Sequence, residues 1–363
     1  MQMDSRPTAD PGSILWDGFG LQTLHSGVGR HAWDLLQALE RAACSPRIIP
    51  SVPTLDFHFS SHILPKNSRW PQSRIKPWAL FWSSQWLKQY MQSRAGLCVV
   101  HGLSNYNIPG LKASRLRKVL TVHDLIPILQ RQEVSAALGH YLRYQLPRAV
   151  AVADAIICVS RWTENTLHDH YPSSRDRTLV IPNGWPRPTE KKAPAGTHLL
   201  TISRQESYKR LGLIPEILQQ LPASFCWTVV TDAGGAALLK SVSDPRLLVQ
   251  SQISDKDMQT LHAAADLYVH PSLLEGFCLP AAASIAQCVP VIFTQGSGID
   301  EVVGEAGMGL SPEAGSRIWA AAILELLANP DRARLCTRRN QSALSWDDVA
   351  ARTRALYDKL GER

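Results

Sequence analysis

The residues with the clearest chemical potential surround Glu275, in the segment Leu267-Tyr-Val-His-Pro-Ser-Leu-Leu-Glu-Gly-Phe-Cys-Leu-Pro280. The apolar run over 267–270 predicts a buried strand, and Pro280 suits the first turn of a helix, where a proline's missing N–H is not needed. Backbone amides at a helix N-terminus attract anions such as phosphate, and a carboxylate accepts hydrogen bonds from hydroxyl groups. The segment therefore suits a ligand that carries both groups, such as a nucleotide-sugar. The amides concerned belong to Gly276, Phe277, Cys278 and Leu279.

Two cations, Arg204 and Lys209, follow a second apolar run over 199–203. Transfer of a sugar from a nucleotide expels a diphosphate, and preorganised cations stabilise the charge that grows on it. Arg and Lys can replace a divalent ion in that role, so the sequence assigns no metal. In isolation, the two residues are more typical of solvated cations in a loop.

Two further features lie in the first half of the chain. Ser26-Gly-Val-Gly-Arg30 precedes a helical pattern, and Gly27 and Gly29 would let the backbone approach a phosphate or a sugar closely. The motif lacks the third glycine of a dinucleotide fingerprint, and a flexible turn is the alternative. His123 ends a run over 119–123 that predicts a strand, and ligands of doubly wound domains bind at the carboxyl ends of strands. A ligand role and a structural role for His123 are both consistent with the residues alone.

Continuous apolar runs alternate with helical patterns along the chain, which indicates parallel strands covered on both faces. A length of 363 residues exceeds what one hydrophobic core usually supports, so we expect two domains. The breaker-rich segment 182–194 is the candidate linker. The prediction is an α/β protein with domains over 1–188 and 189–345, followed by a helix over 346–363. Strands are expected at 13–16, 97–101, 119–123, 155–159, 199–203, 227–230, 247–249, 267–270 and 290–293.

Several features exclude other classes of protein. The N-terminus is polar and no apolar run approaches the roughly 20 residues that span a bilayer, so we expect neither a signal peptide nor a transmembrane helix. The seven cysteines are scattered without a Cys-x-x-Cys pair, which favours free thiols in a reducing cytoplasm over disulfides or a zinc site. Asp255 and Asp257 form an Asp-x-Asp, but after Ser254 they fit a helix cap better than a metal site.

Positive charge concentrates in one stretch of the first half. Between residues 57 and 123 there is no Asp or Glu, while Lys and Arg together occur ten times. Trp78, Trp82 and Trp86 recur at helical spacing in the same stretch. We expect the segment 66–118 to lie on an anionic membrane surface, with a buried tryptophan stripe and solvated cations as the alternative. No nucleic-acid-binding motif accompanies the charge, so no nucleic acid is expected as a partner.

Taken in order, these motifs resemble those of glycosyltransferase family 4, retaining sugar transferases with the GT-B fold. The resemblance covers most of the chain, and its first half is most similar to bacterial mannosyl-type transferases of surface polysaccharide synthesis. It implies two Rossmann-like doubly wound domains that face each other across a cleft, with the last helix crossing back to the first domain. The motifs that carry it are Ile14-Leu-Trp-Asp-Gly18, Ser26-Gly-Val-Gly-Arg30, Thr121-Val-His-Asp-Leu125, Cys158-Val-Ser-Arg161, Ile181-Pro-Asn-Gly184, Ser203-Arg204 with Lys209, and the segment around Glu275.

The resemblance also implies roles for individual residues. His123 and Glu275 would contact the transferred sugar, and Arg204 and Lys209 would stabilise the departing diphosphate, as the catalytic residues. The family's second Glu would fall at Ala283, and its glycines at Cys278 and Cys288. Loss of that Glu, which holds the ribose hydroxyls, would weaken donor binding about ten- to hundredfold. The implied donor-binding residues are Gly27, Gly29, Gly276, Phe277, Cys278, Leu279, Ser297, Gly298 and Glu301, with a place in the first turn of a short helix as the alternative for Glu301.

The predicted function is transfer of a hexose, without metal or cofactor, from a GDP- or UDP-linked donor to a saccharide or lipid-linked saccharide. GDP-mannose is one candidate donor, and the predicted setting is synthesis of cell-surface polysaccharide or lipopolysaccharide. We expect a cytoplasmic protein, peripheral at the inner face of the cytoplasmic membrane. Ala283 leaves one alternative, a pseudoenzyme that supports a partner glycosyltransferase. Another GT-B enzyme, such as an epimerase, is a second alternative.

Overall fold

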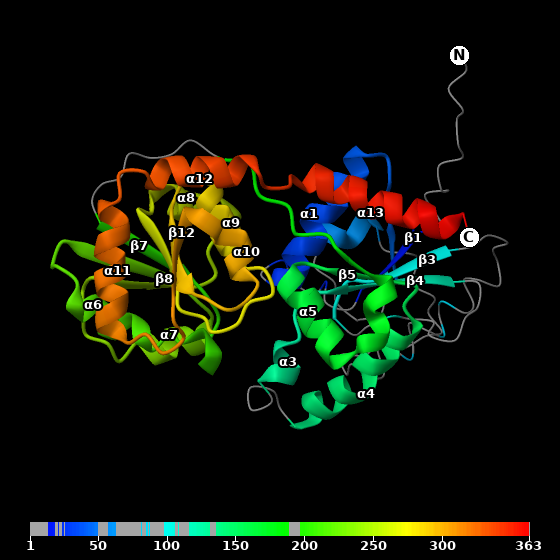
Figure 1. Cartoon of the computed structure of the whole chain (residues 1–363), viewed down its shortest axis with the longest axis horizontal. Helices are drawn as coiled ribbons and strands as arrows, with labels where there is room; N and C mark the ends of the chain where they lie inside the picture. The colour runs from blue at the N-terminus through cyan, green and yellow to red at the C-terminus, as the bar shows by residue number, and fades with distance from the viewer. Residues whose placement is uncertain are drawn as a thin grey trace, which may run out of the picture. The chain divides into compact units, whose positions relative to one another are not determined.

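The structure is a computed structural model in which the chain forms two compact units (Figure 1). The first unit comprises residues 1–184 and 346–363, and the second comprises residues 185–345. The sequence predicts the division after residue 188 and sets 346–363 apart. The structure describes residues 14–18, 21, 24, 26–49, 57–62, 81, 85, 87, 98–105, 108, 116–130, 136–188 and 197–362.

The first unit is built on a six-stranded parallel sheet with the strand order β2-β1-β3-β4-β5-β6. Helices α1 and α13 lie on one face of this sheet, and α4 and α5 lie on the other (Figure 1). The strands are β1 (Ile14–Asp17), β2 (Arg47–Ile49), β3 (Cys98–Gly102), β4 (Leu116–Val122), β5 (Ala155–Cys158) and β6 (Thr178–Val180). The α-helices are α1 (Gly27–Arg41), α3 (Ile126–Leu129), α4 (Ala136–Val152), α5 (Arg161–His170) and α13 (Trp346–Gly361).

The second unit repeats this architecture with the strand order β12-β11-β10-β7-β8-β9, again all parallel. The order is that of a dinucleotide-binding Rossmann fold, and α6 and α11 cover one face while α9 and α10 cover the other (Figure 1). The predicted fold class, two Rossmann-like doubly wound domains, is confirmed. The strands are β7 (Thr197–Ile202), β8 (Phe225–Val230), β9 (Leu247–Gln250), β10 (Leu267–His270), β11 (Val291–Thr294) and β12 (Gly307–Leu310). The helices are α6 (Leu213–Gln220), α7 (Ala233–Leu239), α8 (Asp255–Ala264), α9 (Leu279–Ala286), α10 (Ile299–Val303), α11 (Ser316–Ala328) and α12 (Arg332–Gln341).

The last helix, α13, is tied to the first unit by a buried polar chain. Tyr357 on α13 accepts a hydrogen bond at its hydroxyl from the Trp16 indole (3.1 Å), and the same hydroxyl lies 2.6 Å from Nδ1 of His101. The other ring nitrogen of His101 contacts the Thr121 hydroxyl at 2.7 Å. Burial and the neighbouring His123 lower the pKa of His101 to about 3, so the ring is neutral in this chain of contacts.

The part of the chain that the structure describes contains no helix that is both long enough and apolar enough to cross a membrane. Most of the basic segment 66–118, including its tryptophans, lies outside the described residues. Its predicted contact with a membrane therefore stays a prediction.

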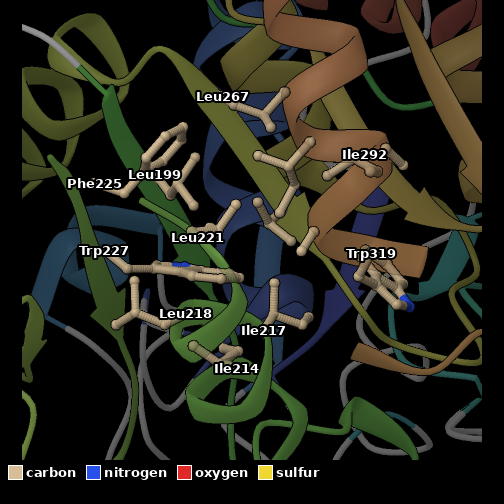
Figure 2. Packing of buried hydrophobic residues seen from close by; sticks show 14 of the residues in the cluster. Leu199, Ile214, Ile217, Leu218, Leu221, Phe225, Trp227, Leu267, Ile292 and Trp319 are labelled. Atoms are coloured by element: carbon tan, nitrogen blue, oxygen red, sulfur yellow. The ribbon is translucent and has the colours of Figure 1, made fainter. Parts of the chain in front are cut away.

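The core of the second unit packs strand residues against α6 and α11, with two large tryptophans among them (Figure 2). Trp227 on β8 and Trp319 on α11 are both fully buried. The Trp227 indole donates a hydrogen bond to the Thr201 hydroxyl at 3.1 Å. Among the described residues, none accepts a hydrogen bond from the indole of Trp319. The two side chains therefore differ in their polar partners while sharing one apolar cluster.

This difference predicts unequal costs of two matched substitutions. Trp227→Phe should lower the free energy of unfolding by about 1 kcal/mol more than Trp319→Phe, because only the first change removes a buried hydrogen bond. The loss of the Trp319 N–H removes a group that is buried without a partner, which offsets part of the lost packing. Urea unfolding followed by circular dichroism measures both values, and a smaller loss for Trp227→Phe would contradict the expectation.

Candidate active site

The candidate site lies where the strand order of the second unit reverses. β7 and β10 are neighbours in the sheet, with Leu199 opposite Leu267, although β8 and β9 lie between them in sequence. In doubly wound sheets, ligands bind beyond the carboxyl ends of the strands at such a point. Lys209 follows β7 and Glu275 follows β10, so both predicted residues belong to this edge.

The Glu275 carboxylate receives two donors on the same oxygen. Lys209 Nζ lies 2.5 Å from Oε1 and His270 Nε2 lies 2.6 Å from it. All three side chains are largely buried, with exposed fractions of 15% for Lys209, 13% for Glu275 and 3% for His270. Among the described residues no donor lies on the second oxygen, Oε2, which leaves it available to a ligand. His270 has no role in the sequence-based interpretation, which treats it only as the end of a strand.

These contacts fix the charge of the carboxylate. Burial acts to raise the pKa of Glu275, but the charges and hydrogen bonds of Lys209 and His270 outweigh it and lower that pKa to about 2. Burial likewise acts to lower the pKa of Lys209, and the charge of Glu275 outweighs it, so that pKa is raised. At neutral pH the pair is therefore ionised, and Oε2 is a charged acceptor suited to hydroxyl groups.

The backbone of Glu275 is held by the loop that follows β11. The Glu275 amide donates to the Ser297 hydroxyl at 3.2 Å, and the Glu275 carbonyl accepts from the Gly298 amide at 2.8 Å. A Cβ added at Gly298 would lie 2.0 Å from the Gly276 carbonyl oxygen, so only glycine fits there. The structure thus brings Ser297 and Gly298 to Glu275, where they act as supports of its backbone.

The segment after Glu275 presents a row of backbone donors. No residue within the described ranges accepts a hydrogen bond from the amides of residues 276 to 279. Cys278 caps α9 in the left-handed region, with φ of 73° and ψ of 76°. Its thiol is buried 3.7 Å from His270 Nε2, and burial together with the Glu275 charge raises the thiol's pKa, so it stays protonated at neutral pH. Anions favour such unpaired amides at a helix start.

The other predicted residues of the second unit are placed less closely. Arg204 is exposed directly after β7, and its charge contributes to lowering the pKa of Asp232, after backbone hydrogen bonds as the main cause. Glu301 is exposed in the first turn of α10, which is the alternative that the sequence left open for it. Ala283 is half-buried on α9, where the family's second Glu would project.

His123 lies immediately after β4 in the first unit and is tightly positioned. Its Nε2–H donates to the Leu103 carbonyl at 2.9 Å, and its backbone amide donates to the Asn105 side chain at 2.6 Å. Burial lowers the pKa of His123 to about 4, although the bond to Leu103 acts to raise it. The ring is therefore neutral at physiological pH, with the Nδ1 lone pair as its remaining acceptor.

Gly27 and Gly29 occupy a different place from the loop that the sequence predicts. Both lie inside the first turn of α1, because Ser26 is the N-cap and its hydroxyl accepts from the Gly29 amide at 2.9 Å. The next histidine, His31, was not singled out by the sequence. Its Nδ1 contacts the Asn183 side chain at 2.8 Å, and its ring meets that of His123 edge-on at 4.8 Å. His31 therefore links Asn183, of the motif Ile181-Pro-Asn-Gly184, to His123.

Within the part of the chain that the structure describes, one group of side chains has the atoms of a metal site. The ligand atoms of His270, Glu275 and Cys278 lie within 4.8 Å of one another, a donor set that zinc can take. The Lys209 ammonium, however, already lies on the Glu275 oxygen that faces His270. Hydrogen bonds and an ion pair account for this arrangement, and we assign no metal to it.

Comparison with known proteins finds two sequence-family matches along the chain. Residues 25–186 match the sequence-family profile described as Glycosyltransferase Family 4, and residues 238–343 match that of Glycosyl transferases group 1. The chain is 35% identical over 115 residues to an MMP alpha-(1->4)-mannosyltransferase of Mycolicibacterium hassiacum and 32% identical over 111 residues to O-antigen chain mannosyltransferase B of Escherichia coli. Each alignment covers 30% of this chain, but only 28% and 29% of the two relatives.

A solved structure shows the same fold over nearly the whole chain. HepE from Anabaena, in complex with UDP and glucose, matches with a TM-score of 0.72 at 16% identity, covering 96% of this chain and 99% of HepE. Two Rossmann-like units in one chain are the units of the GT-B fold of glycosyltransferases. Within that fold, the chain carries a region similar to glycosyltransferase family 4 and a region similar to glycosyl transferases group 1, as its motifs predict.

The contact at Gly298 predicts a sharp effect of one added methyl group. Gly298→Ala should lower transfer or donor hydrolysis about a hundredfold, because the Cβ would push the Gly276 carbonyl and displace Glu275. Gly212→Ala in the same unit is the matched control, since nothing lies within 4 Å of the added Cβ. Steady-state kinetics with equal thermal stability checks the prediction, and equal activity of the two variants would refute it.

Proposed function

We propose that this chain transfers a sugar from a nucleotide-sugar donor to a saccharide or lipid-linked saccharide, with retention of the anomeric configuration and without a metal ion. The observation that carries the proposal is the joint position of Lys209, Glu275 and four unpaired amides at one switch point of the sheet. Cations and amides suit the diphosphate, and the free oxygen of Glu275 suits the sugar hydroxyls.

The reaction proceeds by attack of an acceptor hydroxyl on the anomeric carbon, on the face from which the diphosphate leaves. The bond between the anomeric carbon and the phosphate oxygen breaks, and the departing oxygen takes the proton of the acceptor, so the enzyme supplies no general base. Lys209, Arg204 and the amides of 276–279 stabilise the growing negative charge. Glu275, ionised because its pKa is lowered to about 2, orients the sugar through Oε2.

His123 contributes to the proposed reaction as a neutral ring. Positive charge develops on the sugar ring as the leaving group departs, and an imidazolium would repel it. Because its pKa is lowered, the His123 ring is neutral, and because Nε2–H donates to Leu103, the lone pair lies on Nδ1. That lone pair attracts the positive charge on the sugar ring.

The donor sugar is proposed from the relatives. Two of them are mannosyltransferases by name, and the HepE structure holds UDP with glucose, which supports a hexose donor linked to GDP or UDP. Mannose from GDP-mannose is the first candidate. The O-antigen relative supports the proposal of an acceptor in cell-surface polysaccharide or lipopolysaccharide synthesis.

A screen of donors tests the proposal. We expect one of UDP-glucose, UDP-N-acetylglucosamine, ADP-glucose and GDP-mannose to raise the melting temperature and to be slowly hydrolysed. Arg204→Ala should weaken its binding about ten- to hundredfold through the lost charge-assisted bond, and Glu275→Ala should abolish hydrolysis. Arg317→Ala, which removes another exposed arginine of the same unit, is the control. The absence of a thermal shift with all four donors would favour the pseudoenzyme alternative, and donor binding that neither site variant changes would contradict the proposed site.

We also propose that the basic segment 66–118 holds the protein at an anionic membrane surface, since it carries ten cations and no acid. Sedimentation with vesicles of phosphatidylcholine, with and without phosphatidylglycerol, measures this contact. Binding should require the anionic lipid and weaken with salt, because each cation contributes about 1 kcal/mol. Replacing Lys66, Arg69 and Lys76 by Glu should release the protein, whereas Arg317→Glu with Arg334→Glu should not. Binding that is indifferent to lipid charge contradicts the proposal.

A further inference from the structure

A buried histidine lies directly behind the carboxylate that the proposed function places on the sugar. His270 is the last residue of β10, two residues after Tyr268, so both side chains project from the same face of the sheet. The two rings stack at 5.8 Å with an angle of 19° between their planes, and the Tyr268 hydroxyl lies 3.2 Å from His270 Nδ1. Tyr268 itself is fully buried, so it gives the imidazole a fixed support.

Among the described residues, the other nitrogen of this ring contacts Glu275 and no other partner at hydrogen-bond distance. Nε2 lies 2.6 Å from Oε1, whereas the Cys278 sulfur, a weak partner, lies 3.7 Å away. A glutamate has three side-chain torsions, and an unsupported one samples many rotamers. A donor fixed on Oε1 therefore determines where Oε2 lies.

Lys209 cannot supply this support throughout the reaction. It also contacts Oε1, but its ammonium sits on a flexible four-carbon chain and carries three donors. The proposed function gives this cation to the departing diphosphate, which draws it toward the phosphate as negative charge grows. The histidine has no such second task, because it is 3% exposed and held by Tyr268.

We infer that His270 is the positioning residue of Glu275, holding Oε1 so that Oε2 meets a hydroxyl of the donor sugar while Lys209 serves the diphosphate. The inference rests on the proposed function and deepens it, because it gives the two contacts of Oε1 different tasks. His270 positions the carboxylate, and Lys209 binds the diphosphate. His270 does not touch the donor; it acts through Glu275 alone. The part of the nucleotide-sugar whose binding depends on His270 is therefore the sugar and not the nucleotide.

The first test separates the sugar from the nucleotide. The probe is whichever of the four nucleotide-sugars named above gives the largest thermal shift with the unaltered protein, together with the matching nucleoside diphosphate. His270→Leu should weaken binding of the nucleotide-sugar about tenfold, the value of a hydrogen bond to a charged group, and should change binding of the nucleoside diphosphate less than about twofold. His270→Gln, whose amide can donate to Oε1, should restore most of the loss. Equal weakening for both ligands would overturn the inference.

A matched control shows whether replacing any buried histidine of the second unit gives the same result. His262 is also buried in the second unit and contacts the Ser284 hydroxyl at 2.9 Å, away from Glu275. His262→Leu should lower the melting temperature without separating the two ligands. The same separation in His262→Leu would mean that a general loss of stability explains the effect, and the inference would fail.

A double-mutant cycle tests whether His270 acts through Glu275. Adding His270→Leu to Glu275→Gln should change sugar-nucleotide binding and turnover no further than Glu275→Gln alone, because the residue to be positioned has lost its charge. Additive losses would overturn the inference. If His270→Leu proves too unstable to purify, His270→Asn takes its place, since its shorter amide stops short of Oε1.

Two results distinguish the inference from the proposed function and from a metal site. If Glu275→Gln itself leaves binding and turnover unchanged, the proposed function fails; if it matters and His270→Leu does not, only the inference fails. Turnover that EDTA abolishes and zinc restores would mean that His270, Glu275 and Cys278 hold a metal, and would overturn the positioning role. Activity unchanged by EDTA supports it.

Discussion

A carboxylate taken out of water is tolerated only where its charge is compensated, and the site of this protein is organised around that requirement. Glu275 is 13% exposed and receives Lys209 and His270 on one oxygen. If Lys209 lay on one oxygen and His270 on the other, neither oxygen of the carboxylate would be left for a ligand. Because both lie on Oε1, the charge is satisfied on one side and remains available on the other. Removing one partner of such a buried pair leaves an uncompensated charge, so Lys209 and Glu275 depend on each other as well as on the ligand.

The sheet topology makes this compensation possible. Lys209 and Glu275 are far apart in sequence, and they meet because β7 and β10 are hydrogen-bonded neighbours at the reversal of strand order. A parallel sheet directs the carboxyl ends of all its strands to one edge, so the residues that follow β7, β10 and β11 gather there. After β11, the Gly298 amide donates a hydrogen bond to the Glu275 carbonyl. A side chain at this position would collide with the Gly276 carbonyl, so the residue must be glycine. The same edge thus supplies a cation, an acid and the backbone clamp that fixes the acid.

The sequence predicts much of this arrangement, for identifiable reasons. The strand at 267–270 was predicted with its observed bounds, because β10 is buried at every position and reads as an uninterrupted apolar run. The strands β2, β6 and β12 were missed, since they are short edge strands and β12 reads Gly-Met-Gly-Leu, with little β-propensity. Gly27 and Gly29 were expected in a loop, but the Ser26 cap starts the helix earlier. His270 and His31 were missed because their partners, Glu275 and Asn183, become neighbours only through folding, and spacing along the chain carries no such information.

The remaining departure, Ala283, has a consequence for specificity that follows from the charges. Position 283 lies on α9 and is half-buried, so an acid there would place a second carboxylate near the start of the same helix whose amides are unpaired. A carboxylate near those amides would be attracted to them, whereas an alanine leaves them open to another anion. Under the proposed function Glu275 is the acid that meets the sugar, so the preference among donors should depend more on the sugar and the diphosphate than on the ribose.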